Sequence, residues 1–455
     1  MRPLVRVSRK LTFFIGISGV LWASGCASAI SQAPSTLTRS MQKVRVQPQD
    51  AKLPPSPEDS MQLDASFDVH DVDTMAHQLT QGRRRVPGLA VAIVHNGQIL
   101  LNSGYGITNV HNPVPVTKHT VFRIASLSKA FASAATGLLI NDGLLRWDNK
   151  IQDFIPSFHL INAQASQSLT IADILSQRTG LPRNAFDREI EANADYYSLL
   201  QRLGDLPLIC APGQCYSYQN VAFSLIGNII YAASGDYYQK VVEGRIFNPL
   251  NMNDASFGIA GLENSPEWAH PHMRSRHGWV CLLPREAYYH LPAAAGVNAS
   301  SSDMVQWLLA QLGHRPTVLP NQLVATLHTP LVLTPGERNT GWRRERVQDA
   351  NYALGWRIFN YAGHTLVFHA GAVQGYRGVV ALLPERDLGI SLLWNAETSE
   401  PAGLLPTILD RALGLPPRHW LKMPIDNDLG SESLQAGHIV RKRAMGGARN
   451  YAAPK

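Results

Sequence analysis

The sequence predicts an α+β fold: one antiparallel β-sheet, flanked by helices and built from both ends of the chain, plus a mostly helical lobe. Two observations lead to this prediction. A β-hairpin signal lies near the start of the folded region, and several strand-like segments joined by short turns lie near its end. Short helical patterns alternate with loops between them, and such a segregation of strands and helices is typical of α+β proteins.

The predicted sheet begins with a hairpin. Two segments with strand character, Leu89–His95 and Gln98–Gly104, flank Asn96-Gly97, which is the strongest short hairpin signal. The C-terminal strands are predicted at Tyr352–Tyr361, Thr365–His369, Arg377–Leu383 and Gly389–Trp394.

A helix is predicted over Ser126–Asn141, with Gly143 just past its end as a stop signal. This segment is apolar on every face, as expected for a helix buried inside a domain, and Lys129 is its only charge. Residues 144–290 form the predicted helical lobe, with helical patterns such as Leu169–Gln177 and Val221–Ser234.

Composition excludes several classes of protein. The chain has 455 residues, of which 45% are hydrophobic and 16% charged, so disorder of the bulk is excluded and a large core is possible. No segment reaches the ~18 uninterrupted apolar residues of a membrane-spanning helix. The net charge of +7 comes from the first ten and the last 35 residues, which leaves the middle neutral. We therefore expect no nucleic-acid partner.

Residues 1–25 resemble the signal peptide of a bacterial lipoprotein. A basic start precedes the apolar run Leu11–Trp22, and the small residues 23–25 stand directly before Cys26. The resemblance implies that Cys26 is lipidated and anchors the protein in a membrane of the cell envelope. Because Ala27 and not Asp follows the cysteine, it implies the outer membrane, facing the periplasm. The alternative is plain secretion with cleavage near Ala29.

The segments around the folded domain have a different composition. Residues 26–65 are rich in Ser, Gln, Pro and Thr and end in the proline-rich residues 54–57, so we predict a flexible tether. Residues 66–420 form the predicted folded domain, and residues 421–455 are predicted to be a disordered tail.

The first chemical motif is the tetrad Ser126-Leu127-Ser128-Lys129. Residues three apart lie on one face of a helix, so the hydroxyl and the amine can meet, and a neutral amine can take the proton of a serine. A serine near a helix N-terminus also has free backbone N–H groups nearby for an oxyanion. The same pattern at residues 40–43 falls in the tether, so only the buried-helix context gives the tetrad meaning.

Two further motifs follow in the sequence. Tyr218-Gln219-Asn220 precedes an apolar helical segment, and a tyrosine near a lysine can relay protons while an asparagine orients lysine and substrate amide. Residues 369–372, His-Ala-Gly-Ala, close a predicted strand, where Gly371 permits close approach by another backbone. Taken singly, each residue is more often a packing residue.

Together and in this order, the three motifs resemble the serine β-lactamase and penicillin-binding protein superfamily. The closest resemblance is to D-alanyl-D-alanine carboxypeptidases and esterases related to class C β-lactamases. It covers roughly residues 75–415, with further matching segments at 169–175, 179–182, 212–213, 246–252, 302–304, 375–376 and 382–386. The resemblance implies the β-lactamase/DD-peptidase fold, which agrees with the α+β prediction.

The resemblance also implies roles for individual residues. Ser126 would be the acylated nucleophile, Lys129 its proton partner and Tyr218 an assistant in acid and base steps. Asn220 would hold the substrate amide. The oxyanion hole would consist of the backbone N–H groups of Ser126 and Ala372. The substrate would be a small molecule or a peptide, and no cofactor and no metal are expected.

The strand motif departs from that of class C β-lactamases. His369 stands where those enzymes have a lysine, and a histidine is charged only part of the time near neutral pH. The resemblance implies that His369 and Gly371 bind substrate, with His369 meeting a substrate carboxylate. Ala370 and Ala372 also lack a hydroxyl, so a peptidase or esterase is expected ahead of an efficient β-lactamase.

Several alternatives stay open at this point. Cys210 and Cys215 bracket four residues directly upstream of Tyr218 and form either a disulfide or two free thiols. Four residues, His270, His272, His277 and Cys281, have spacings that could suit zinc, but their neighbours favour a loop near the mouth of the site. The competing function is a catalytically inactive envelope lipoprotein that uses the fold as a binding module.

Overall fold

The computed structural model describes residues 62–81 and 86–422. The predicted signal peptide (1–25), Cys26, most of the tether (26–65) and most of the tail (421–455) lie outside these residues. Among the helices that are described, none combines the length and the apolar character needed to cross a bilayer.

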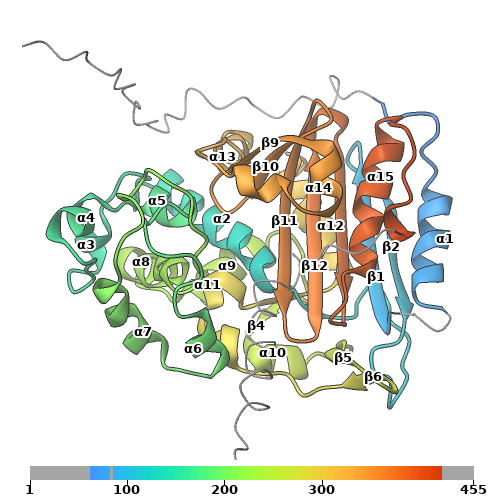
Figure 1. Cartoon of the computed structure of the whole chain (residues 1–455), viewed down its shortest axis with the longest axis horizontal. Coiled ribbons are helices and arrows are strands. Elements are labelled where there is room, and N and C mark those ends of the chain that lie inside the picture. Colours follow the sequence, from blue (N-terminus) through green and yellow to red (C-terminus); the bar gives the residue numbers. More distant parts are fainter. Residues whose placement is uncertain (1–61, 82–85, 423–455) are drawn as a thin grey trace, which may run out of the picture. The chain divides into compact units, whose positions relative to one another are not determined.

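The largest element is an eight-stranded antiparallel sheet, in the order β2-β1-β13-β12-β11-β10-β9-β8 (Figure 1). Its strands are β1 (Gly88–His95), β2 (Gln98–Gly106), β8 (Val332–Leu333), β9 (Val347–Tyr352), β10 (Arg357–Tyr361), β11 (His364–Val373), β12 (Tyr376–Leu383) and β13 (Leu388–Trp394). Strand β1 pairs with the last strand, β13, with Leu89 opposite Trp394. The sheet is thus built from both ends of the chain, and the fold class predicted from the sequence is confirmed.

The N-terminal hairpin forms where the sequence predicts it. Asn96 and Gly97 both have positive φ, +48° and +71°, as a tight two-residue turn between antiparallel strands requires. Strand β2 continues to Gly106, two residues beyond the predicted end.

Two predicted strands are corrected by the structure. Residues 352–361 are not one strand, because β9 ends at Tyr352 and β10 begins only at Arg357. The turn between them contains Gly355 (φ +76°), where a Cβ would lie 2.8 Å from the carbonyl oxygen of Lys129. The apolar character of this turn therefore reflects its packing against the helix that contains Lys129, and it does not indicate pairing in the sheet. Strand β11 also continues past His369 to Val373.

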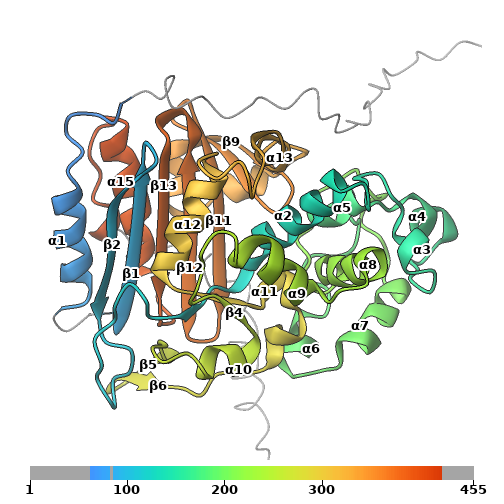
Figure 2. The same cartoon turned by 180° about the vertical axis from the view of Figure 1, so that it is seen from behind.

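The two faces of the sheet are covered differently. Along β1, Leu89, Val91 and Ile93 face the cluster that contains α1 (Val69–Leu79) and α15 (Leu404–Ala412). The alternate residues of β1 face the opposite cluster, which contains α2 (Ser128–Asn141) and α12 (Ser301–Gln311). Figures 1 and 2 show these helices on the two sides of the sheet. The larger cluster continues from the sheet through α2 into the helical region.

The helices of residues 144–290 are short. They are α3 (Ile151–Phe154), α4 (Ala163–Ser168), α5 (Ile171–Leu175), α6 (Asp187–Glu191), α7 (Tyr196–Arg202), α8 (Leu225–Ser234), α9 (Tyr238–Val242) and α10 (Gly258–Glu263). The remaining helices are α11 (Pro292–Ala295), α13 (Asn321–Leu327) and α14 (Gly341–Arg346). There are two small sheets among the described residues. One consists of β3 (Phe122–Arg123), β7 (Val297–Ala299) and β4 (Ser256–Phe257), and the other consists of β5 (His272–Ser275) and β6 (Gly278–Cys281).

Candidate active site

Ser126 lies on a short 3-10 turn (Ala125–Leu127) that connects β3 to the buried helix α2. The α-helix itself begins at Ser128, two residues later than predicted. Ala125 has φ +51°, a conformation that costs a non-glycine residue energy and that tends to occur at functional sites. The Ser128 hydroxyl donates to the Ala125 carbonyl at 2.6 Å and accepts from the Val297 N–H at 3.0 Å, which holds the turn in place.

Lys129 is completely buried and its amine points at the serine. Its Nζ lies 3.3 Å from Ser126 Oγ, 2.7 Å from Asn220 Oδ1 and 3.1 Å from the Ala294 carbonyl oxygen. The ring centroid of Tyr218, a side chain that is 1% exposed, lies 4.8 Å from the same nitrogen. The four residues predicted to act on protons and on the substrate amide therefore meet at one point.

Asn220 is oriented by a residue that the sequence did not single out. Its Nδ2 donates to Asp187 Oδ2 at 2.8 Å, and Asp187 is the first residue of α6 and is buried. This contact turns the amide oxygen toward Lys129. No local pattern distinguishes Asp187 from the charged residues that follow it, so only the tertiary contact reveals its role.

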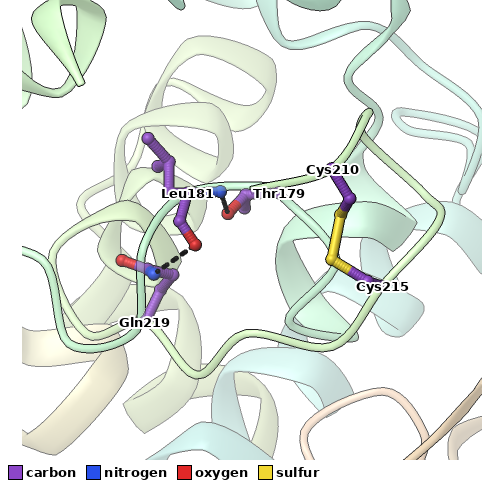
Figure 3. Close-up of a disulfide and its surroundings, with 5 residues drawn as sticks. All are labelled: Thr179, Leu181, Cys210, Cys215 and Gln219. Carbon is purple, nitrogen blue, oxygen red and sulfur yellow. Dashed lines mark hydrogen bonds between the residues drawn. A yellow bond between two sulfur atoms is a disulfide. The ribbon is translucent and has the colours of Figure 1, made fainter. Parts of the chain in front are cut away.

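The loop that carries Tyr218 is fastened to the segment before α6. Cys210 and Cys215 form a disulfide, as Figure 3 shows. Gln219, the residue between Tyr218 and Asn220, donates from its backbone N–H to Gln177 Oε1 at 2.6 Å and accepts from Gln177 Nε2 at 3.1 Å. The side-chain amide of Gln219 also donates to the Leu181 carbonyl oxygen at 3.4 Å (Figure 3). These bonds limit the freedom of Tyr218 and Asn220.

Strand β11 passes very close to the turn that bears Ser126. A Cβ on Gly371 would lie 2.4 Å from the Ile124 carbonyl oxygen and 3.2 Å from the Ser126 backbone nitrogen, so only glycine fits at this position. Ala372, whose N–H is the second predicted oxyanion donor, is the next residue of the strand. The strand edge and the serine turn are thus held side by side.

The structure places His369 beneath the site and not at its mouth. The side chain is fully buried, and its Nε2 lies 3.1 Å from the Tyr352 hydroxyl and 3.2 Å from Arg357 NH1. Burial, together with the positive charges of Arg357 and Lys129, lowers the pKa of His369 well below its usual value. The ring is therefore neutral at physiological pH, and the partial positive charge expected from the sequence is corrected. The prediction was wrong because the residue type alone does not reveal that a buried guanidinium lies beside the ring.

Arg357 belongs to a buried ionic cluster that sequence analysis missed. Its Nε lies 3.4 Å from Glu337 Oε2, and the same oxygen accepts from Arg343 NH1 at 2.7 Å. Although burial alone would raise it, the pKa of Glu337 is lowered by the positive charges of Arg357, Arg343 and Arg183. These residues come from separate elements, so no spacing in the sequence indicates their contact.

The four residues considered for zinc do not form a metal site, although His272 and Cys281 lie opposite each other in the β5–β6 hairpin. His272 is buried, with Nδ1 2.9 Å from the Asn395 carbonyl oxygen and Nε2 accepting from the Val110 N–H at 3.2 Å. Burial lowers its pKa to about 4, so the ring stays neutral and joins β5 to the end of the large sheet. Among the described residues, no group of three or more His, Cys, Asp or Glu side chains could hold a metal ion.

Comparisons with known proteins identify the family of the chain. The sequence profile of the Beta-lactamase family matches residues 72–414. The chain is 28% identical over 332 residues to Protein flp of Staphylococcus aureus (strain NCTC 8325 / PS 47) and 26% identical over 344 residues to the unguisins hydrolase ungD' of Aspergillus campestris (strain IBT 28561). These alignments cover 71% and 72% of this chain but only 62% of each relative, which is less than two thirds of their length.

A solved structure shows the same fold. The octameric penicillin-binding protein homologue from Pyrococcus abyssi superposes with a TM-score of 0.69 at 23% sequence identity, over 78% of this chain and 79% of that one. Since the profile covers most of the chain, including every strand of the large sheet, and the fold agrees with it, the chain belongs to the Beta-lactamase family.

Proposed function

We propose that this protein is a serine hydrolase that acts through an acyl-enzyme on Ser126. The observation that carries the proposal is the 3.3 Å contact between Lys129 Nζ and Ser126 Oγ, inside a site completed by Tyr218 and Asn220. A nucleophile within hydrogen-bond reach of a base, which is itself oriented by a third group, is the arrangement that activates a weak nucleophile. The relative named as a hydrolase supports this class of reaction.

The proposed reaction has two halves. In the first, Lys129 takes the proton of Ser126 Oγ and the oxygen attacks the substrate carbonyl. The bond to the leaving group then breaks as Tyr218 gives that group a proton and is reprotonated by Lys129. The negative oxygen that develops would be stabilised by the N–H groups of Ser126 and Ala372, and the close packing of Gly371 against the serine turn supports this pairing. In the second half, water attacks the acyl ester and gives up a proton to the Tyr218–Lys129 pair, which returns a proton to Ser126 Oγ as the carboxylic acid product leaves.

Candidate substrates are D-amino-acid peptides of the cell wall, β-lactams and small esters or amides. The neutral, buried His369 offers no exposed positive charge to a substrate carboxylate. We therefore place esterase activity, or cleavage of a peptide bond that has no carboxylate beside it, ahead of efficient β-lactam hydrolysis, since β-lactams carry such a carboxylate. The competing proposal, an inactive binding module, does not account for the proton relay around Lys129.

Labelling of the serine tests the reaction. We expect a serine-directed fluorophosphonate to add to the purified protein and Ser126→Ala to abolish both the adduct and ester turnover. Ser133→Ala is a matched control from the same helix, because the Ser133 hydroxyl is buried and, among the described residues, makes no hydrogen bond. Equal labelling of the wild type and Ser126→Ala, seen by intact mass, would refute the proposal; no labelling of the wild type favours the binding module.

Benzylpenicillin separates the substrate classes. A lasting mass adduct that is absent from Ser126→Ala indicates a penicillin-binding peptidase. Consumption of the drug without an adduct indicates a β-lactamase and contradicts the ranking given above. Neither adduct nor consumption, together with turnover of a neutral ester, indicates an esterase.

We also propose that the protein is a lipoprotein of the cell envelope, anchored through Cys26 in the outer membrane. The support is the apolar leader and the small residues before the cysteine. We expect Cys26→Ser to move the protein from the detergent phase to the aqueous phase in a Triton X-114 partition. Unchanged partitioning of the variant would contradict the anchor.

A further inference from the structure

We infer that Arg357 is a positioning residue for the proposed reaction: it holds His369 in one tautomer and thereby fixes the strand edge that carries the Ala372 N–H. The inference rests on the proposed function, because this N–H acts on the reaction only if an oxyanion forms beside Ser126. It assigns a task to two buried groups, Arg357 and His369, that the proton relay itself does not use.

The hydrogen bonds around His369 determine where its proton lies. A guanidinium can only donate, so Nε2 of His369, which lies 3.2 Å from Arg357 NH1, must be the accepting nitrogen. The Tyr352 hydroxyl, 3.1 Å from the same nitrogen, is able to donate to it as well. The proton of a neutral ring is then on Nδ1, which lies 2.8 Å from the Ala370 carbonyl oxygen and donates to it.

The bond to Ala370 acts on the predicted oxyanion hole through the strand. Backbone groups of alternate residues leave the same edge of a β-strand, so the Ala370 carbonyl and the Ala372 N–H share one edge of β11. Strand β10 begins at Arg357, opposite Phe368, and therefore leaves the residues from His369 onward without a partner on that side. The histidine bond restrains the peptide at the place where pairing with β10 stops.

Glu337 keeps the guanidinium in place. Burial alone would lower the pKa of Arg357, but the Glu337 carboxylate raises it well above its usual value, so this side chain stays charged and donating. The charged and titratable groups that the structure places around the His369 ring are Arg357 from β10, Lys129 from α2, Tyr352 from β9 and Tyr218 from the loop before α8. The two positive charges among them, on Arg357 and Lys129, disfavour a protonated ring.

The test combines kinetics with NMR of the histidine ring. In the full-length wild type, labelled with ¹⁵N-histidine, we expect the His369 signal to show one neutral Nδ1–H ring that does not titrate between pH 5 and 8. Loss of the signal in His369→Gln assigns it. In Arg357→Met the donor to Nε2 is lost, so we expect the ¹⁵N shifts to show the Nε2–H tautomer beside the Nδ1–H one. The pKa of His369 should also rise because a positive neighbour has been removed, while burial, the larger cause of its lowering, remains.

Turnover of the neutral ester p-nitrophenyl butyrate provides the second readout. We expect kcat of Arg357→Met to fall about tenfold with KM little changed, whereas Arg357→Lys retains part of the rate. Arg346→Met is the matched control. It removes an arginine that bonds Asp410 at 3.0 and 2.8 Å in a cluster with Tyr361, away from the predicted site residues, so it should lower the melting temperature and leave kcat and the His369 signal unchanged.

Two results would overturn the inference. One is a kcat for folded Arg357→Met equal to that of the wild type, and the other is an unaltered His369 signal in the same variant. If the wild type neither turns over the ester nor labels at Ser126, the proposed function fails instead, and the catalytic part of the inference fails with it. The NMR comparison still decides whether Arg357 sets the state of His369.

Discussion

Asn220 links two buried charged residues across the candidate site. Its Oδ1 accepts from Lys129 at 2.7 Å and its Nδ2 donates to Asp187 at 2.8 Å. Because an amide has one accepting and one donating end, these two partners determine which way the group faces. The carboxylate of Asp187 therefore orients the Asn220 oxygen that accepts from Lys129, and it acts on the lysine through Asn220.

Removal of Asp187 should weaken the reaction more than it weakens the fold. In Asp187→Ala the amide of Asn220 loses its acceptor and can rotate away from Lys129, so we expect kcat to fall about 10- to 100-fold, as for loss of a charge-assisted hydrogen bond. Asp187→Asn keeps an accepting oxygen and should lose less. Ester turnover measures both variants.

Glu189→Ala serves as the control for this prediction. Glu189 lies on the same helix, and its side chain is 40% exposed in a loose 3.8 Å pair with Arg202. A surface pair of this kind contributes little, so turnover should stay at the wild-type level. If Asp187→Ala and Glu189→Ala have the same kcat, Asp187 has no role in orienting Asn220.

At the scale of elements, β11 and the serine turn pack backbone against backbone at Gly371. The strand contributes no side chain at Gly371, and the vacant Cβ position lies 2.4 Å from the Ile124 carbonyl oxygen. A strand and a turn can meet at this distance only where one of them has no side chain. The spacing of the two predicted oxyanion donors, on Ser126 and Ala372, follows from this packing of backbone on backbone.

Gly371→Ala should therefore separate the two elements. The added methyl group meets backbone atoms that cannot rotate away, so β11 must shift, and we expect kcat to fall roughly 10²- to 10³-fold, as for loss of one oxyanion donor. Gly244→Ala is a fair comparison, because a Cβ there meets no atom within 4 Å and should leave turnover unchanged. Full activity of Gly371→Ala would show that the close approach does not position the oxyanion hole.

At the scale of the whole molecule, the features that depend on neighbours in the sequence were predicted better than the contacts between residues far apart in the sequence. The turn at Asn96-Gly97 and the spacing of Ser126 and Lys129 are set by neighbours in the sequence, and both lie in the structure as expected. The pairs Asn220–Asp187 and Arg357–Glu337 join residues from separate elements, and no local pattern encodes them. Prediction was thus reliable where backbone geometry decides and failed where burial changes the charge of a side chain.

The neutral state of His369 and the break between β9 and β10 have the same origin. In both cases the residue types were interpreted without knowing what packs against them. The apolar residues around Gly355 pack on α2, and the ring of His369 packs against Arg357. Sequence order alone cannot show either neighbour, although the order of the three motifs was enough to indicate the family.

The pairing of Leu89 with Trp394 governs when this protein can fold. During synthesis the hairpin β1–β2 emerges early, but the other edge of β1 has no partner until β13, close to the end of the described domain, has been made. Contacts between residues so far apart in sequence close large loops and form slowly. One edge of β1 therefore stays unpaired while the chain is being made. The sheet can be completed only after β13 has been synthesised.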